Sequence, residues 1–249
     1  MGRKGMSKHI KREVSPVFWP IHRKTDVWAV HPSPGPHSAY RAIPLLVVVR
    51  DILKYASNSR EAEIILKQGK VKVDGKVRRD SGFPIGLMDV LEIPATKEFF
   101  RVLPNNKGLG LHRIKGDETE IKLVRIESRK TVNGGHVQLN LHDGGNIVIG
   151  VTDATRQHET EFGTYDVLKV HLRDKGIEQV LRLDEGASAL ITSGASSGQV
   201  GRIQAINKRA GFPDTVTLVT AGNEEIRTVI DYVFPVGTEE PIISVPRGD

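Results

Sequence analysis

The sequence contains no cysteine in its 249 residues. Disulfide bonds and thiolate metal sites are therefore excluded, and the composition fits a protein of the reducing cytosol. The first residues lack the apolar block of a signal peptide, so nothing argues for secretion. Long apolar runs are missing as well. The longest, residues 43–49, is far too short to span a bilayer, and we expect no membrane partner.

Aromatic residues are scarce, at 5% of the chain, whereas there are 25 glycines and 13 prolines. Few large rings and many turn formers indicate several small units instead of one large core. We expect a multidomain α+β protein with four parts. These are a basic proline-rich arm (1–42), a helix–hairpin module (43–104), a β-rich domain (105–183) and a small β-barrel (184–249).

Acidic residues are scarce only in the first 50 residues, and Lys and Arg outnumber them up to residue 130. Residues 1–50 have 9 Lys and Arg against 2 Asp and Glu, residues 51–130 have 17 against 12, and residues 131–249 have 10 against 16. A strongly positive surface favours polyanionic partners. An anion-binding surface is therefore expected in the first half.

The first 42 residues have no sustained apolar period, five prolines and both tryptophans. We expect an arm that becomes ordered on a phosphate backbone, because it cannot bury enough surface to fold alone. A flexible tail or a transit peptide is the alternative, but Trp19 and Trp28 count against both. The two rings could stack on bases or pack the arm on its own domain, and packing is the preferred interpretation. The arm's candidate phosphate-binding residues are Arg3, Lys4, Lys8, Lys11, Arg12, Arg23, Lys24 and Arg41.

Two short helices are predicted after the arm. The first rests on apolar residues at helical intervals, namely Leu45, Val49, Ile52 and Ala56. Asn58 followed by Glu61 is a capping box for the second helix, and Gly69 ends it.

A basic β-hairpin follows the helices. From Lys70 the apolar period drops to two, Asp74-Gly75 predicts the turn, and residues 88–93 supply a third strand. Six cations fall within residues 67–79, with Asp74 as the only acid, and we assign Asp74 to the turn. A charge run is usually a solvated face, but like charges this close repel each other, which favours polyanion binding. The candidate RNA-binding residues are Arg50, Arg60, Lys67, Lys70, Lys72, Lys76, Arg78 and Arg79.

The residue pattern of 105–183 predicts β-strands almost throughout. Residues 136–142 alternate strictly, with Val137, Leu139 and Leu141 inward, and further strands are predicted at 121–126, 147–151 and 167–172. His136 and His142 share a face, but about 20 Å separates them along a strand, so they cannot hold one ion. We predict no metal and solvent-facing histidines.

Residues 184–249 predict a small barrel built around a glycine-spaced loop. No Lys-Ser or Lys-Thr pair follows Gly194, Gly198 or Gly201, so a phosphate-binding loop and a nucleotide cofactor are excluded. Gly201 is expected where a side chain would clash, and strands are expected at 216–220 and 226–236. Arg202, Lys208 and Arg209 are predicted to contact RNA at one edge. The acidic remainder would face solvent or neighbouring proteins.

Several motifs resemble known families. Ser59–Ala62 (S-R-E-A), residues 69–76 (G-x-V-x-V-D-G-K) and residues 89–93 (D-V-L-E-I) resemble the RNA-binding module first described in ribosomal protein S4. The glycine-spaced loop resembles the KOW motif of SH3-like barrels. With the phrases at 8–12 (KHIKR), 34–37 (PGPH), 139–144 (LNLHDG), 231–234 (DYVF) and 243–248 (ISVPRG), the whole chain resembles the ribosomal protein S4e family.

That resemblance implies a structural constituent of the small ribosomal subunit, bound to ribosomal RNA and to neighbouring ribosomal proteins. It implies no catalytic residue, cofactor or small-molecule substrate. The end at Asp249, without the basic extension of eukaryotic members, indicates an archaeal protein.

Two rival functions use the same RNA-binding module. One is an RNA-modifying enzyme, for which Asp143 and Asp231 are candidates only by default, since turn or strand-end roles suit them better. The other is a translation or transcription factor that associates transiently. Residues 105–249 offer no clustered acid, His and Ser constellation, which counts against the enzyme.

Overall fold

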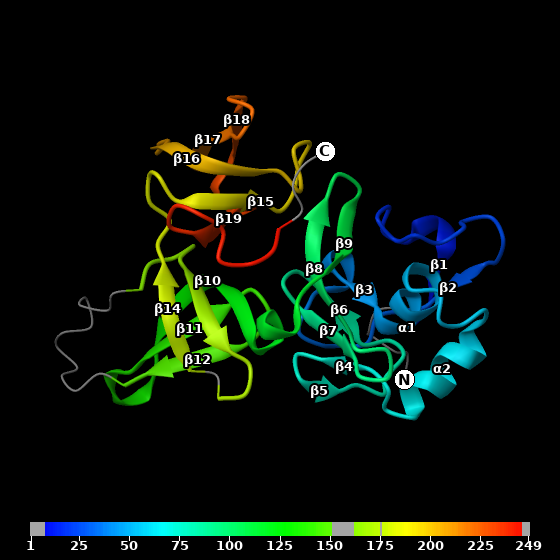
Figure 1. Ribbon diagram of the computed structural model, residues 1–249. Helices are drawn as coiled ribbons and strands as arrows, with labels where there is room; N and C mark the ends of the chain where they lie inside the picture. Colours follow the sequence, from blue (N-terminus) through cyan, green and yellow to red (C-terminus); the bar gives the residue numbers. More distant parts are fainter. Residues whose placement is uncertain (1–7, 151–161, 175, 246–249) are drawn as a thin grey trace, which may run out of the picture.

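The computed structural model describes residues 8–150, 162–174 and 176–245, so the predicted contacts of Arg3 and Lys4 lie outside the described residues. Within these ranges the chain forms three five-stranded antiparallel sheets and a few short helices (Figure 1). The fold is thus mostly β, with less helix than the expected α+β class. None of the described helices is long and apolar enough to cross a membrane.

The arm is docked on the module. Its strands β1 (Ile10–Lys11) and β2 (Trp28–Ala29) pair with each other, and 3₁₀ turns span Arg12–Val14 and Ala39–Arg41. Trp19 is 2% exposed within the module's core, and its indole N–H donates to the Ala42 carbonyl at 2.9 Å. The expectation of an arm ordered only by RNA is therefore corrected for residues 8–42, because a buried ring anchors them.

Arm residues 33–37 lie between the module and the central sheet. The Ser33 N–H donates to the Gly82 carbonyl at 2.7 Å, and the ring of His37 lies against Gly86. Gly144, with φ +72°, approaches Pro36 so closely that an added Cβ would lie 3.1 Å from the Pro36 carbonyl oxygen. The segment is thus enclosed by chain from both sides.

The module begins with β3 (Ile43–Pro44), which pairs with β6 (Pro84–Ile85). Helix α1 (Leu45–Val47) continues as a π-helix (Val48–Ile52), and Lys54 then has φ +57°. The first helix is shorter than predicted because this widened turn and left-handed residue end it. Helix α2 (Ser59–Lys67) has the expected cap: the Asn58 side chain accepts from the Glu61 N–H at 2.9 Å.

The module's sheet has the order β5-β4-β7-β8-β9. Its strands are β4 (Lys72–Val73), β5 (Lys76–Val77), β7 (Val90–Ile93), β8 (Glu98–Asn105) and β9 (Gly108–Arg113). Asp74 and Gly75, with φ +50° and +71°, make the hairpin turn between β4 and β5. The expected domain boundary after residue 104 falls inside the β8–β9 hairpin, whose two strands belong to one sheet.

The central sheet has the order β12-β11-β10-β13-β14. A 3₁₀ turn at Gly116–Glu120 precedes β10 (Ile121–Thr131), and another at Asn133–Gly135 precedes β11 (Val137–Leu141). The other strands are β12 (Asn146–Ile149), β13 (Val167–His171) and β14 (Ile177–Leu181). Along β11 the predicted inward residues Val137, Leu139 and Leu141 are buried. Residue 151, included in a predicted strand, lies outside the described residues.

The C-terminal sheet has the order β18-β17-β16-β15-β19. Its strands are β15 (Ser188–Ile191), β16 (Val200–Asn207), β17 (Thr215–Thr220), β18 (Glu225–Val229) and β19 (Val233–Gly237). A 3₁₀ turn at Ile230–Tyr232 divides the single strand predicted over 226–236. At Gly201 an added Cβ would lie 2.9 Å from the Val219 carbonyl oxygen, which explains the glycine as expected.

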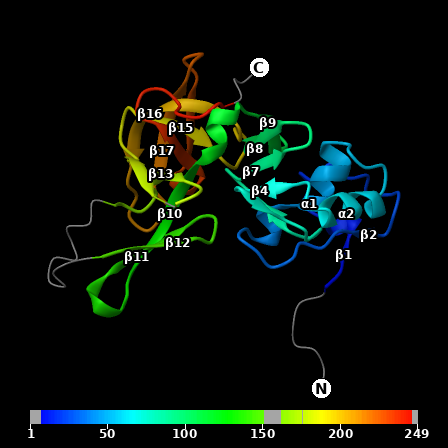
Figure 2. The same ribbon diagram turned by 60° about the horizontal axis from the view of Figure 1, so that its bottom comes forward.

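One apolar core joins all three sheets. Met88 and Leu103 of the module meet Leu123, Val167 and Leu181 of the central sheet and Leu190, Phe234 and Val236 of the C-terminal sheet. The module and arm lie on one side of this core and the other two sheets on the other (Figure 1, Figure 2). The units predicted from the sequence are therefore packed into one body.

A buried ammonium group lies at the junction of the module and the central sheet. Lys122 Nζ on β10 lies 2.6 Å from Asp74, 2.6 Å from Asp89 and 3.3 Å from Asp143. Its side chain is 4% exposed. Burial by itself lowers the pKa of Lys122, but the three carboxylates outweigh burial and raise that pKa above its ordinary value. Asp74 is therefore an interdomain partner as well as a turn residue.

His37 of the arm completes this cluster. Its Nε2 lies 3.0 Å from Oδ2 of Asp89, which also accepts from the N–H of Gly86 at 2.9 Å. Burial alone would raise the pKa of Asp89, but Lys122 and His37 hold it well below its ordinary value. Arm, module and central sheet thus meet at one set of charges.

Replacing Lys122 by Met should destabilise the protein by about 3–5 kcal/mol at neutral pH, because the substitution leaves buried carboxylates without their cation. The lowered pKa of Asp89 stabilises the folded wild type above its ordinary pKa and loses that effect as the pH falls. The carboxylates of the variant can take up protons instead. Urea unfolding should therefore give a smaller stability difference at about pH 4 than at pH 7.

Lys169→Met is the matched control, since Lys169 pairs with Glu178 at 2.9 Å on a more exposed face of the central sheet. This variant should lose little stability, because surface pairs contribute little. Equal losses in the two variants, or a loss for Lys122→Met that does not depend on pH, would show that the cluster does not hold the junction.

Candidate nucleic-acid interface

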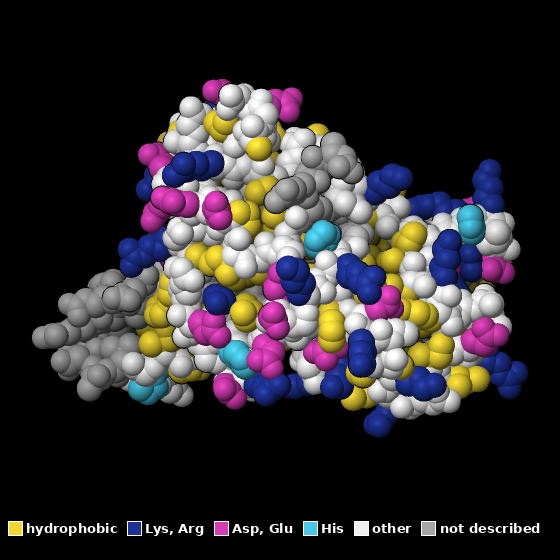
Figure 3. All heavy atoms as spheres, viewed as in Figure 1, with side chains coloured by type: hydrophobic (Ala, Val, Ile, Leu, Met, Phe, Trp, Pro, Cys, Tyr) yellow, Lys and Arg dark blue, Asp and Glu magenta, His cyan; other side chains and the backbone are white. Residues whose placement is uncertain are grey.

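Exposed cations surround the end of α2 and the β4–β5 hairpin. Arg79 lies beside Gly69 at the end of α2, since an added Cβ at Gly69 would be 3.7 Å from the Arg79 guanidinium. A cation suits this position because the carbonyl end of a helix carries partial negative charge. Figure 3 shows Lys and Arg side chains spread over the module and arm. The exposed members of this set are Arg60, Lys67, Lys70, Lys76 and Arg79.

Three other predicted residues of the module are engaged within the protein. Arg50 donates to both carboxylate oxygens of Asp51 and to Ser59. Arg78 lies 4.4 Å above the ring centre of Phe83, and Lys72 Nζ is 4.0 Å from Glu92. These side chains are half-buried and hold local structure. Their contribution to an RNA-binding face is smaller than that of the exposed cations.

The predicted residues of the arm also fall into two groups, those engaged within the protein and those exposed. Arg12 donates to the carbonyls of Trp28 and His22 and pairs with Asp26 at 2.8 Å. Arg23 donates to the carbonyls of Glu13, Ser15 and Pro16. These two guanidinium groups tie the arm's loop together. Lys8, Lys11, Lys24 and Arg41 are exposed.

In the C-terminal sheet Arg202, Lys208 and Arg209 are exposed, far along the chain from the module. Arg202 donates from Nε to the Gly186 carbonyl at 2.8 Å. Lys208 and Arg209 follow the end of β16, in the loop before β17. They form a separate small basic edge.

A groove of about 420 Å³ separates the hairpin from the central sheet. Lys76 and Arg78 line one side, and Gly144 and His171 line the other. Among the described residues, Arg78 Nε and His171 Nδ1 are buried without a hydrogen-bond partner. The groove continues the cationic surface of the hairpin toward the central sheet.

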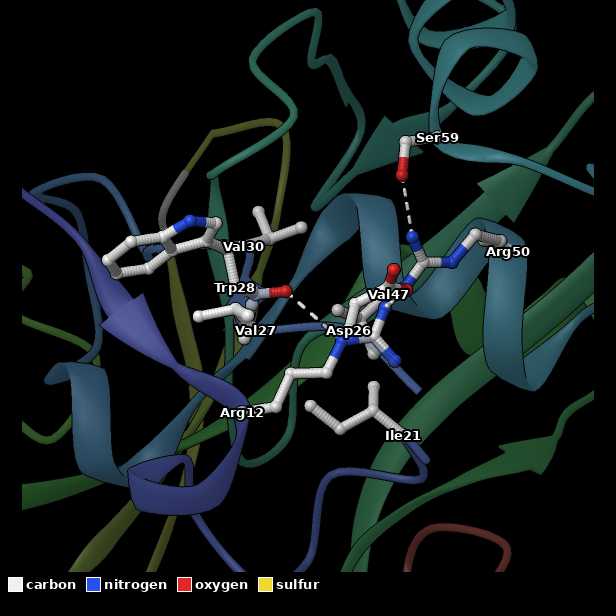
Figure 4. A pocket seen from close by; sticks show the side chains of 10 residues that line it. Arg12, Ile21, Asp26, Val27, Trp28, Val30, Val47, Arg50 and Ser59 are labelled. Carbon is white, nitrogen blue, oxygen red and sulfur yellow. Dashed lines mark hydrogen bonds and ion pairs between the residues drawn. The ribbon is translucent and has the colours of Figure 1, made fainter. Parts of the chain in front are cut away.

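A second cavity, of about 580 Å³, lies between the arm and the module (Figure 4). Arg12, Ile21 and Trp28 come from the arm, and Arg50 and Ser59 come from the module. In Figure 4 the Trp28 indole and the Arg50–Ser59 pair lie on opposite sides. The cavity therefore opens where the two basic segments meet.

The prediction of solvent-facing histidines is wrong for His37 and His142. His37 is 9% exposed, and the His142 ring contacts the Phe234 ring edge-on at 5.5 Å. Nδ1 of His142 accepts from the Arg125 N–H and Nε2 donates to the Leu87 carbonyl. Burial and the Lys122 ammonium lower the pKa of His142 to about 4. Both rings are therefore interdomain packing groups.

Asp143 and Asp231, the candidate catalytic residues of an RNA-modifying enzyme, both have structural partners. Asp143 accepts from the Gly145 N–H at 2.9 Å within its turn, and Asp231 accepts from the Tyr165 hydroxyl at 2.7 Å. Within the described residues no group of three or more His, Asp and Glu could hold a metal ion. The predicted turn role of Asp143 agrees with the first contact.

Sequence reasoning missed three buried cations at the domain junctions. Arg101 of β8 is fully buried and donates to the carbonyls of Glu118 and Ile121, while Arg125 of β10 donates to those of Asp231 and Val233. Lys122 is the third. Lys122 and Arg125 lie in the strand predicted at 121–126 and Arg101 in a strand that was not predicted, and no local pattern marked any of the three as buried.

Three family models match the chain in succession. Residues 4–40 match the RS4NT (NUC023) domain, residues 43–91 match the S4 domain, and residues 96–177 match the model described as ribosomal family S4e. The first two matches cover the arm and the helix–hairpin segment that carry the exposed cations.

Archaeal relatives match along the full length. The small ribosomal subunit protein eS4 of Ignicoccus hospitalis is 46% identical over 98% of this chain and 97% of its own, and that of Methanocaldococcus jannaschii is 45% identical over 98% and 100%. The crystal structure of the 30S ribosomal protein S4e from Thermoplasma acidophilum superposes with a TM-score of 0.67 at 31% identity, covering 80% of this chain and 96% of that one. The chain therefore belongs to the ribosomal S4e family.

Proposed function

We propose that this protein is a structural constituent of the small ribosomal subunit that binds ribosomal RNA through its arm and S4-like module. The family supports this, since the relatives are named small ribosomal subunit proteins and residues 43–91 match the S4 domain. The location of the RNA-binding face is inferred from the exposed cations around α2 and the hairpin. An archaeal cytoplasm is the expected setting, as for those relatives.

The RNA-binding mechanism is electrostatic and depends on a rigid scaffold. Exposed lysines and arginines displace counterions from phosphates, and this release supplies the free energy of binding. The helix cap at Asn58 and the tight turn at Asp74-Gly75 fix the backbone that carries these cations. Since the cations are held in one arrangement, the module favours an RNA surface of matching shape. No chemical step on RNA is required of the protein.

The C-terminal sheet has a separate role in this proposal. Its strand order, with β15 between β16 and β19, supports an SH3-like barrel, and residues 192–199 between β15 and β16 are its KOW-like loop. This loop lies on the module, since an added Cβ at Gly198 would be 2.8 Å from Asn105 Cα. The loop is therefore occupied within the protein. The acidic residues of 184–245, which lie mostly in the turns, are left to face solvent or neighbouring ribosomal proteins.

Changing Lys70, Lys76 and Arg79 together to Gln should weaken binding to small-subunit ribosomal RNA and flatten its salt dependence. Each lost phosphate contact should lower the log–log slope by roughly 0.7–0.9, so the triple variant should lose about 2–3. Filter-binding titrations at several salt concentrations measure this. The control carries the same charge change at exposed Lys107, Lys115 and Lys130, and should keep the slope. Equal losses in both variants would place the RNA face elsewhere.

A constituent and a transient factor behave differently in a sucrose gradient. We expect this protein to remain in the small-subunit peak of a native cell extract at high salt, because many contacts must break together for release. Mass spectrometry of the gradient fractions checks this. If the protein appears at the top of the gradient after the high-salt wash, it is a transient factor. If RNA incubated with the purified protein contains altered nucleosides, the protein is an RNA-modifying enzyme.

A further inference from the structure

The two tryptophans have opposite environments. Trp19 is 2% exposed and donates its N–H to a carbonyl, whereas Trp28 is 57% exposed. Within the described residues no hydrogen bond of the Trp28 indole N–H is found. Trp28 contacts the His9 ring, with centroids 5.5 Å apart and planes tilted by 52°. A large amphipathic ring left at the surface is typical of a contact site for a partner.

The arm–module cavity beside Trp28 is of the right size and chemistry for a small planar group. Its volume of about 580 Å³ lies within the range of about 300–1,000 Å³ for ligand sites. Ile21, Val30 and Val47 give it apolar walls, and Ser59 adds a hydroxyl. Such walls suit the faces of a nucleobase better than a phosphate.

The two arginines in the wall do not make it an anion site. Both Nη1 hydrogens of Arg12 are used by His22 and Thr25, and its remaining guanidinium nitrogens donate to Trp28 and Asp26. Arg50 is neutralised by Asp51. Because these charges are balanced by the protein, phosphate affinity at this place must come from other cations.

Lys11 supplies such a cation. The β1–β2 register places Lys11 directly opposite Trp28, so the two exposed side chains lie on the same face of the pair. A base stacked on the ring would have its phosphate within the reach of a long lysine side chain. The basic arm, with Lys8 and Lys24 also exposed, favours RNA over a protein as the occupant.

We propose that Trp28 and the adjoining arm–module cavity form a binding site for an unpaired nucleobase of RNA. The inference rests on the proposed function, because it assumes that the arm lies against ribosomal RNA. Trp28 stacks on the base and Lys11 meets the phosphate, with the cavity adjoining on the module side of the strand. The cations around the hairpin would bind folded RNA, whereas this site would bind a nucleotide outside a helix.

Tryptophan fluorescence tests the site directly, since Trp28 is the exposed member of the two. Titration of the full chain with a single-stranded octaribonucleotide of mixed sequence should quench the emission saturably. The same octamer annealed to its complement should quench weakly, because its bases are already stacked. Trp28→Phe should abolish the quenching and retain affinity within about threefold, since Phe also stacks.

The affinity for the single strand measures the stacking itself. Trp28→Ala should weaken it by about 5- to 150-fold, the range of one lost base–aromatic stack. Because no charge is removed, the salt slope should not change. Val17→Ala is the matched control: Val17 is 87% exposed on the same arm but does not line the cavity, and its variant should bind like the wild type. Thermal unfolding checks that both variants are folded.

The proposal is overturned by equal quenching with single strand and duplex, or by a folded Trp28→Ala variant that keeps wild-type affinity. If that variant binds RNA normally but enters small subunits poorly, the surface serves a protein neighbour and the nucleobase site is wrong. These results leave the proposed function intact. The function fails separately if the Lys70, Lys76 and Arg79 variant keeps its salt slope.

Discussion

A single ammonium group among three carboxylates sets the arrangement of this protein. Lys122 can be 4% exposed only because Asp74, Asp89 and Asp143 surround it, and each comes from a different turn or strand. An uncompensated charge at that depth would cost several kcal/mol. The hairpin, the strand after it and the central sheet must therefore meet in one geometry. The hairpin that we propose to bind RNA has its turn in this cluster, so the orientation of its cations follows from the same contacts.

Cations have two distinct roles in the chain. Arginines mostly hold the fold together, whereas lysines mostly lie exposed at the surface. Arg12, Arg23, Arg101 and Arg125 donate several hydrogen bonds each to backbone carbonyls inside the protein. A planar guanidinium with five donors suits this task. Most exposed cations of the first half are lysines, whose compact charge on a flexible stem suits a phosphate backbone. Lys122 is the exception, since three carboxylates converge on it.

Local structure was readable from the sequence, whereas contacts between distant segments were not. The Asn58 cap, the Asp74-Gly75 turn and the inward face of Val137, Leu139 and Leu141 depend on neighbours within a few residues, and they were predicted. Net charge located the basic half. No local pattern could reveal that Asp74 meets Lys122, 48 residues away, or that Trp19 is buried while Trp28 is exposed. The residues next to a turn aspartate or a tryptophan in the sequence do not indicate which distant group that side chain will contact.

The enclosure of residues 33–37 has a consequence for biosynthesis. This segment touches Gly82 and Gly86 on one side and Gly144 on the other, so its final surroundings come from two widely separated parts of the chain. A nascent polypeptide emerges N-terminus first, and Gly144 follows this segment by more than 100 residues. The beginning of the chain therefore cannot reach its native setting until more than half of the polypeptide has left the exit tunnel. Until then the face of this segment that Gly144 covers in the folded protein is exposed, although Trp19 can already dock on the module.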